Sequence, residues 1–194
     1  MTAPASTPHA DPGARRSLRA RLRGGPVARA IARVDVRVYR LLREDAQSSR
    51  LEQPIRRFSS LGEHAAIWLA LGLAGAAADA PRRASWLRAT RSVLYAYALN
   101  TLLKTVVRRR RPQLEQLPAL ISTPTSLSFP SAHASSSFAA ARAYSALVPA
   151  GAPLYATATA MALSRVYLGV HYPSDIAAGA LLGTLVGGAG RRAR

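Results

Sequence analysis

Three short segments of the chain place basic, hydroxyl and imidazole side chains at spacings that suit the handling of a phosphate group. The first is KTVVRRRRP, from Lys104 to Pro112, in which Lys104 and Arg111 stand seven residues apart. Seven residues is close to two helical turns, so a helix that continues this far would place both cations on one face. Arginine can bind two phosphate oxygens through its planar fork, while lysine supplies a compact charge. Lys104 is the only lysine in the chain, which favours a specific role for it.

The second segment is FPSAHASSS, from Phe129 to Ser137. A proline followed by a serine is typical of a helix start, where unpaired backbone N–H groups and the positive end of the helix dipole suit a phosphate. Ser131 can donate its hydroxyl, and His133 lies within the first turn. Taken alone, the segment is more typical of an ordinary helix cap than of a binding site.

The third segment is SRVYLGVHYPSD, from Ser164 to Asp175, which places three ionisable groups in one of the most apolar parts of the chain. His171 and Asp175 stand four residues apart, so the carboxylate can orient the imidazole, and Pro173 between them indicates a turn just before a helix. Fixing one ring nitrogen leaves the other free as a nucleophile or base. Ionisable residues such as Arg165 near membrane segments are costly and are therefore functional candidates.

The elements that must position these segments are apolar stretches of near-spanning length. The chain is 49% hydrophobic and carries a formal net charge of +18, so charge and apolar segments must be segregated. A helix needs about 20 residues to cross the hydrocarbon, and we expect five transmembrane helices. They are Leu61 to Ala78, Leu87 to Val107, Ser131 to Val148, Ala152 to Val170 and Ile176 to Ala189. Short turns and one long loop, Arg108 to Pro130, would bring the three segments together at one membrane face.

The region before these stretches is rich in arginine. Residues 1–25 lack the apolar core of a secretory signal and predict a disordered basic leader. Pro26 to Glu44 predicts an amphipathic helix that lies on an anionic membrane surface, with a packed cytosolic helix or a nucleic-acid-binding arm as alternatives. Its basic face is Arg29, Arg33, Arg37 and Arg40, and its apolar face is Val27, Ile31, Val34, Val38 and Leu41. The chain has no cysteine, which excludes disulfides and thiol nucleophiles.

In order and spacing, the three segments resemble the signature KxxxxxxRP, PSGH and SRxxxxxHxxxD of the type 2 phosphatidic acid phosphatase (PAP2) superfamily. The resemblance covers roughly residues 87–188, and three ordered motifs are far more specific than one. Ala132 stands where the family usually has glycine, and its methyl group could crowd the phosphate. The resemblance implies an all-α, polytopic membrane helix bundle with a PAP2/haloperoxidase-like core. The expected domains are 1–25, a leader; 26–58, a membrane-surface helix and connector; 59–190, the transmembrane phosphatase domain; and 191–194, a basic tail.

The resemblance also implies a role for each matching residue. His171 would attack phosphorus to form a phosphohistidine, Asp175 would orient it, and His133 would protonate the leaving group. No metal or other cofactor is implied. Arg108, Arg109 and Arg110 fall at variable positions and are assigned to the membrane interface. The phosphate would be held by Lys104, Arg111, Ser131, Ala132 through the helix-start backbone, and Arg165.

The substrate expected from the resemblance is a phosphomonoester or pyrophosphate on a membrane lipid. The best match is a prenyl-linked sugar phosphate of cell-envelope synthesis, of the decaprenylphosphoryl-5-phosphoribose type, with undecaprenyl pyrophosphate, phosphatidylglycerophosphate and phosphatidic acid as alternatives. A non-catalytic basic membrane protein and a vanadate haloperoxidase are the other classes, and no nucleic-acid partner is expected. Arginines before the first span predict a cytoplasmic N-terminus and, with five spans, an active-site face on the cytoplasmic side of the plasma membrane.

Overall fold

The computed structural model of the chain describes residues 25–44, 49–149 and 151–192. Within them the ordered elements are all helical, as predicted, apart from one isolated bridge between Arg110 and Leu127. In chain order the elements are α2 (Pro26–Glu44), α3 (Ser49–Ser60), the 3₁₀ turn η1 (Glu63–Ala65), α4 (Ala66–Ala78), the 3₁₀ turn η2 (Ala80–Arg82), α5 (Arg83–Val107), α6 (Ala132–Tyr144), α7 (Ala152–Tyr167) and α8 (Pro173–Arg192).

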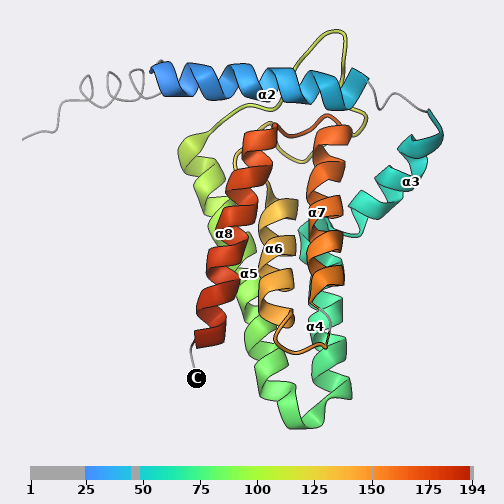
Figure 1. Ribbon diagram of the computed structural model, residues 1–194, viewed down its shortest axis with the longest axis vertical. Coiled ribbons are helices and arrows are strands. Elements are labelled where there is room, and N and C mark those ends of the chain that lie inside the picture. Colours follow the sequence, from blue (N-terminus) through green and yellow to red (C-terminus); the bar gives the residue numbers. More distant parts are fainter. Residues whose placement is uncertain (1–24, 45–48, 150, 193–194) are drawn as a thin grey trace, which may run out of the picture.

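Helices α4 to α8 run side by side as a bundle, and α2 lies across one end of it (Figure 1). Helix α6 is the centre of the bundle and packs against α5, α7 and α8. Its residues are mostly small, and nearly all of them are buried, including Ala134, Ser135, Ala139 and Ala143. A helix buried on most faces needs side chains that let its neighbours approach closely, and the alanines and serines of α6 meet that need.

The contact between α6 and α8 is a close approach of two backbones. Gly179, Gly183 and Gly187 follow one another at intervals of four residues along α8 and face the α6 backbone, and a Cβ at Gly183 would lie 2.1 Å from the carbonyl oxygen of Ser135. Small residues at this spacing allow helices to pack closely. The backbone N–H of Ser131 also donates to the carbonyl of Asp175 at 3.0 Å. This packing fixes the start of α6 against the start of α8.

Buried hydrogen bonds tie α4 and α5 to the central helix. The Trp68 indole donates to Ser137 at 2.8 Å, and the Asn100 amide donates to Ser135 at 2.8 Å. The Tyr144 hydroxyl donates to the carbonyl of Trp68 at 2.9 Å. Buried hydrogen bonds between helices, such as these, favour a single arrangement of the bundle.

Several helix ends differ from the limits expected from hydrophobicity. The stretch that begins at Leu61 is broken by η1, where His64 and Ala65 adopt positive φ values of 51° and 62°, so α4 starts only at Ala66. Helix α6 stops at Tyr144, and α8 continues to Arg192, which includes two residues expected in the basic tail. Hydrophobicity indicates which residues can be buried, but the end of a helix depends on where the backbone turns, so the two limits need not coincide. The expected leader lies outside the described residues except for Gly25.

A helix that spans a membrane must be both long and apolar. No single helix among the described residues meets both requirements. The segments Arg50–Ser60 and Glu63–Ala78 meet them together, across a bend of 48°.

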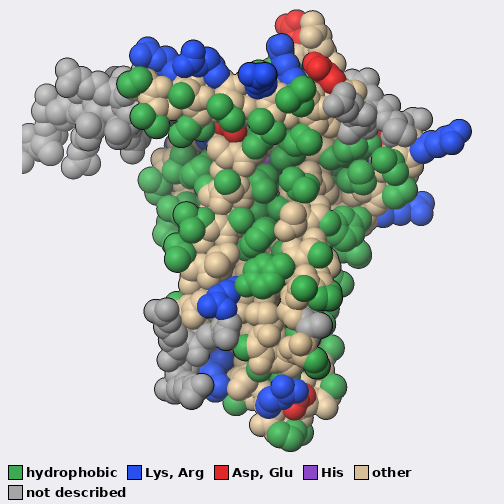
Figure 2. Space-filling model, viewed as in Figure 1, with side chains coloured by type: hydrophobic (Ala, Val, Ile, Leu, Met, Phe, Trp, Pro, Cys, Tyr) green, Lys and Arg blue, Asp and Glu red, His purple; other side chains and the backbone are tan. Residues whose placement is uncertain are grey.

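Helix α2 has the predicted limits, but it presents three faces rather than two. The arginines at positions 29, 33, 37 and 40 are exposed, and so are Val27, Ile31, Val34 and Leu41. The third face is a buried polar stripe, Asp35, Tyr39 and Arg43, which packs against the end of the bundle. In Figure 2 the basic groups of α2 follow its outer edge, and hydrophobic groups follow the edge nearer the bundle.

Candidate active site

A cavity of about 190 Å³ brings together residues from all three sequence segments. It lies where α5, α6 and α7 end or begin, beneath the loop of residues 122–125. The residues expected from sequence that line it are Lys104, Arg111, Ala132, His133, Arg165 and His171. The lining holds three cations and three imidazoles against one carboxylate, that of Glu63, so the cavity is suited to a compact anion.

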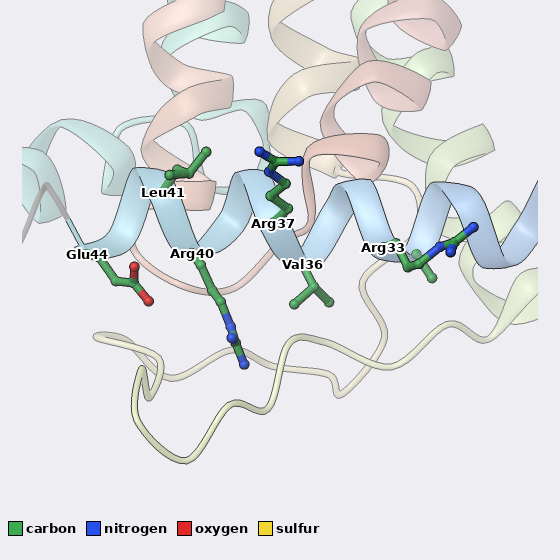
Figure 3. A pocket seen from close by; sticks show the side chains of 7 residues that line it. Arg33, Val36, Arg37, Arg40, Leu41 and Glu44 are labelled. Carbon is green, nitrogen blue, oxygen red and sulfur yellow. The ribbon is translucent and has the colours of Figure 1, made fainter.

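A larger hollow of about 610 Å³ lies along α2 (Figure 3). The described residues that line it all come from that one helix, and they include Arg33, Arg37 and Arg40 but no histidine. The hollow therefore lacks a group suited to nucleophilic or acid–base chemistry near neutral pH. The smaller cavity is the candidate active site.

Lys104 and Arg111 reach this cavity in a different way from the one expected. Helix α5 ends at Val107, the limit expected from the sequence, and Arg108 adopts a positive φ of 53°, so the longer helix that would place Lys104 and Arg111 on one face does not form. The chain turns back instead, and backbone carbonyls hold both cations. Lys104 donates to the carbonyl of Ser128 at 3.2 Å, and Arg111 donates to that of Val170 at 2.7 Å. Burial lowers the pKa of Arg111 to about 10, which still leaves it charged at neutral pH.

His171 lies in the turn before α8, as the sequence indicated, and α8 begins at Pro173 rather than at the expected Ile176. Its Nδ1 lies 3.5 Å from Oδ2 of Asp175, and its Nε2 lies 3.2 Å from Nη1 of Arg111. A guanidinium can only donate, so Nε2 must supply the lone pair, and in a neutral ring the proton resides on Nδ1. Burial, followed by the charges of Arg111, Lys104 and Arg165, lowers the pKa of His171 well below 6.5. The imidazole is therefore neutral, with its lone pair on the nitrogen beside the cations.

Ser59, near the end of α3, contacts two predicted site residues and was not identified from the sequence. Its carbonyl oxygen lies 3.1 Å from Nε2 of His133, and its hydroxyl accepts a hydrogen bond of 2.7 Å from Arg165. Because a carbonyl oxygen only accepts, Nε2 of His133 carries a proton, which leaves Nδ1 to exchange one. Ser59 is buried, and it has no motif around it that would reveal this role.

Ser131 and Ala132 begin α6, as predicted. Ser131 is the N-cap, and its hydroxyl oxygen accepts from the backbone N–H of Ala134 at 3.5 Å. It is fully buried and does not line the cavity, so its predicted hydroxyl contact with phosphate stays a prediction. Ala132 does line the cavity, at the position where the helix exposes its first N–H groups.

Arg109 was assigned to the membrane interface, and this assignment is wrong. Its guanidinium donates to Oδ1 of Asp175 at 2.9 Å and to Oδ2 of Asp35 at 2.7 Å, and it lies 4.3 Å from the ring centre of Tyr172. The turn at Arg108 directs this arginine inward, while its neighbours on either side are exposed. The available signal was Asp35, the only acidic residue within an arginine-rich helix before its last residue.

The remaining wall of the cavity is formed by residues that carry no motif. His64 and Tyr97 contact each other, with Nδ1 of the histidine 2.9 Å from the tyrosine hydroxyl, and Glu63 lies beside them. His64 has a positive φ, which is uncommon for a residue other than glycine and frequent at functional sites. These groups add hydrogen-bonding side chains to the wall of the cavity.

Comparison with known proteins agrees with this geometry. The model of the PAP2 superfamily matches residues 85–193. Decaprenylphosphoryl-5-phosphoribose phosphatase of Mycobacterium tuberculosis is 44% identical over 147 residues, covering 73% of this chain and 82% of that protein. The protein of the same name from Mycolicibacterium smegmatis is 47% identical over 126 residues, covering 64% of this chain and 68% of that protein.

Two solved structures share the fold. Aquifex aeolicus LpxE superposes with a TM-score of 0.71 at 25% identity, covering 82% of this chain and 95% of that chain. A transmembrane PAP2-type phosphatidylglycerolphosphate phosphatase from Bacillus subtilis gives 0.65 at 22% identity, covering 92% and 94%. The three motifs line one cavity, and the family match and these relatives indicate the same family. The chain belongs to the PAP2 superfamily and is a hydrolase of the phosphatase class.

Proposed function

We propose that the chain hydrolyses a phosphate ester on a membrane lipid through a phosphohistidine at His171. The observation that carries this proposal is the environment of that imidazole. Nδ1 faces the carboxylate of Asp175, and Nε2 presents its lone pair beside Arg111. A ring held in this tautomer is a nucleophile that needs no separate base.

In the first step, Nε2 of His171 bonds to phosphorus while the bond from phosphorus to the leaving oxygen breaks. A phosphate oxygen gives Arg111 a new acceptor, which releases the Nε2 lone pair. The ring becomes positively charged, and the 3.5 Å separation from Asp175 can shorten into a charge-assisted hydrogen bond. Lys104, Arg111 and Arg165 balance the negative charge of the transferred group.

His133 supplies the proton that the leaving oxygen needs. Its Nε2–H is directed at the carbonyl of Ser59, so Nδ1 of the charged ring is the donor. A bound phosphate dianion favours that charged ring. In the second step, neutral His133 takes a proton from water, the water oxygen bonds to phosphorus, and the bond to His171 breaks to release phosphate. A well-placed acid and base of this kind contributes about 10²–10⁴-fold.

The proposed substrate is a prenyl-linked sugar phosphate of the decaprenylphosphoryl-5-phosphoribose type. Support comes from the named substrate of relatives that are 44% and 47% identical to this chain. A cavity wall that contains Glu63, His64 and Tyr97 offers hydrogen-bonding groups of the kind that contact sugar hydroxyls.

We further propose that residues 59–190 form the membrane-embedded phosphatase domain with five spans and that residues 26–58 form a surface helix and connector. The proposal is supported by outward-facing leucines in the bundle, such as Leu73, Leu102 and Leu185 at 56–63% exposure. A soluble protein seldom exposes so many large apolar side chains together. The exposed basic and apolar faces of α2 suit an anionic membrane surface. Helix α2 contacts the loops around His171, so the two lie on the same side of the membrane. Because the arginines of α2 favour the cytoplasmic side, we place the active site there, at the plasma membrane.

The test is phosphate release by the purified full-length chain from a panel of lipids, with EDTA present. The panel is decaprenylphosphoryl-5-phosphoribose, undecaprenyl pyrophosphate, phosphatidylglycerophosphate and phosphatidic acid, and His171→Ala is the control. We expect the highest kcat/KM for the first lipid and no release by the variant. Preference for another lipid would overturn the substrate proposal, and release by His171→Ala would overturn the mechanism.

A further inference from the structure

One buried ion-pair network connects the surface helix α2 to the histidine proposed as nucleophile. Asp35 of α2 is only 2% exposed, yet its carboxylate has three donors. The backbone N–H of Ser174 donates to Oδ1 at 2.8 Å. The Ser174 hydroxyl and Arg109 donate to Oδ2 at 2.6 and 2.7 Å. A buried carboxylate is costly without such partners, so these contacts fix Asp35 against the turn that follows His171.

Arg109 extends the network from Asp35 to Asp175. One of its terminal nitrogens binds each carboxylate, at 2.7 Å for Asp35 and 2.9 Å for Asp175. Oδ2 of Asp175 accepts from the backbone N–H of Tyr172 at 2.9 Å and faces Nδ1 of His171. The guanidinium on Oδ1 and the amide on Oδ2 therefore determine how the carboxylate is rotated toward the imidazole.

Two further contacts fix α2 in register with the site loops. The Tyr39 hydroxyl lies 3.3 Å from the carbonyls of Leu117 and Gly169. Arg43 donates to the carbonyl of Tyr167 at 2.7 Å. Asp35, Tyr39 and Arg43 recur every four residues, so one face of the helix contacts the chain on both sides of His171.

We propose that Asp35 and Arg109 are positioning residues for the His171–Asp175 pair, which makes α2 part of the active site. The catalytic consequence rests on the function proposed above. Neither residue lines the cavity. Asp35 acts by holding Arg109, and Arg109 acts by binding Oδ1 of Asp175, which aims the other carboxylate oxygen at Nδ1 of His171. Without Arg109, Asp175 loses the cation that directly contacts it and can rotate or take up a proton.

The first test is kinetic. Arg109→Gln and Asp35→Asn should each lower kcat by about 10- to 100-fold, because small displacements of reacting groups raise the activation free energy. KM should change by less than about 3-fold. Arg110→Gln removes an exposed neighbouring charge and should stay within about 2-fold of wild type. In a double-variant cycle, Arg109→Gln should cost less than about 3-fold once Asp175→Asn is present. Losses that multiply independently, or losses confined to KM, would overturn the proposal.

The second test needs no substrate and so separates this inference from the proposed function. Histidines labelled with ¹⁵N report their tautomer by NMR in nanodiscs, and His171→Gln assigns the signal. Wild type should show His171 protonated at Nδ1, and Asp35→Asn and Arg109→Gln should move it toward a mixture of tautomers, with Arg110→Gln unchanged. An unaltered signal in both variants would overturn the inference even if the enzyme is active, and an altered signal would support it even if the wrong lipid has been chosen.

Discussion

Replacing Gly183 with alanine tests whether the close contact between α6 and α8 sets the geometry of the site. The new Cβ would lie 2.1 Å from the carbonyl oxygen of Ser135 and 2.8 Å from the backbone nitrogen of Ala139. Real Cβ atoms essentially never approach below 3.0 Å, so the helices must separate by about 0.9 Å at this level. Both obstructing atoms belong to helix backbone, so a change of rotamer cannot relieve the clash.

The expected cost of Gly183→Ala follows from two opposing effects. Overpacking a tight contact costs about 1–3 kcal/mol, while alanine gains up to about 1 kcal/mol over glycine in helix propensity. A net loss of about 1–2 kcal/mol corresponds to a Tm lower by about 2–8 °C for a chain of this size. Because α6 carries His133 and α8 carries Asp175, we expect kcat to fall by about 10- to 100-fold.

Gly188→Ala is the matched control on the same helix. Its Cβ would meet only Nε of Arg142, at an ordinary distance of 3.7 Å. The assay follows the fluorescence of Trp68 and Trp86, both buried in the bundle, during thermal unfolding, together with phosphate release. Equal Tm and equal kcat for the two variants would refute the claim that α6–α8 packing positions the site.

Three further predictions concern charge, pH and topology. Arg111→Lys keeps the charge but loses the forked contact, so kcat/KM for the lipid should fall by at least about 10-fold, measured by phosphate release; an unchanged value would contradict bidentate phosphate binding. Below about pH 6.5 the unfolded chain protonates His171, whereas the folded chain, with its lowered pKa, does not. As the pH is lowered, stability should therefore decrease more steeply in wild type than in His171→Gln. Parallel profiles of Tm against pH would contradict this prediction. The chain lacks cysteine, so Arg110→Cys should react with a membrane-impermeant maleimide only when the cytoplasmic face is exposed, and labelling from outside intact cells would reverse the proposed orientation.

The sequence predicted six of the residues that line the cavity, because their chemistry is concentrated in three short segments, whereas the wall that contains Glu63, His64 and Tyr97 was not predicted. Local residue types also predicted the helix start at Ser131 and the turn that holds His171 before α8, since both depend on local backbone preferences. The limits of α2 were correct for the same reason.

The sequence did not predict contacts that depend on how the chain reverses direction. Four consecutive arginines look alike in a sequence, and only the positive φ of Arg108 separates Arg109, which points inward, from its exposed neighbours. Ser59 and Asp35 reach the site from helices far away in the chain. Their roles follow from tertiary packing, which no local pattern records.

The most direct test of the central claim is to identify the residue that carries phosphate during turnover. The chain is mixed with a ³²P-labelled lipid phosphate, quenched in alkali, where phosphohistidine survives, and digested for peptide mapping. We predict label on the peptide that contains His171, and its loss in His171→Ala with EDTA making no difference. Label on another residue, or turnover in wild type with no phosphorylated intermediate after rapid quenching, would contradict the account.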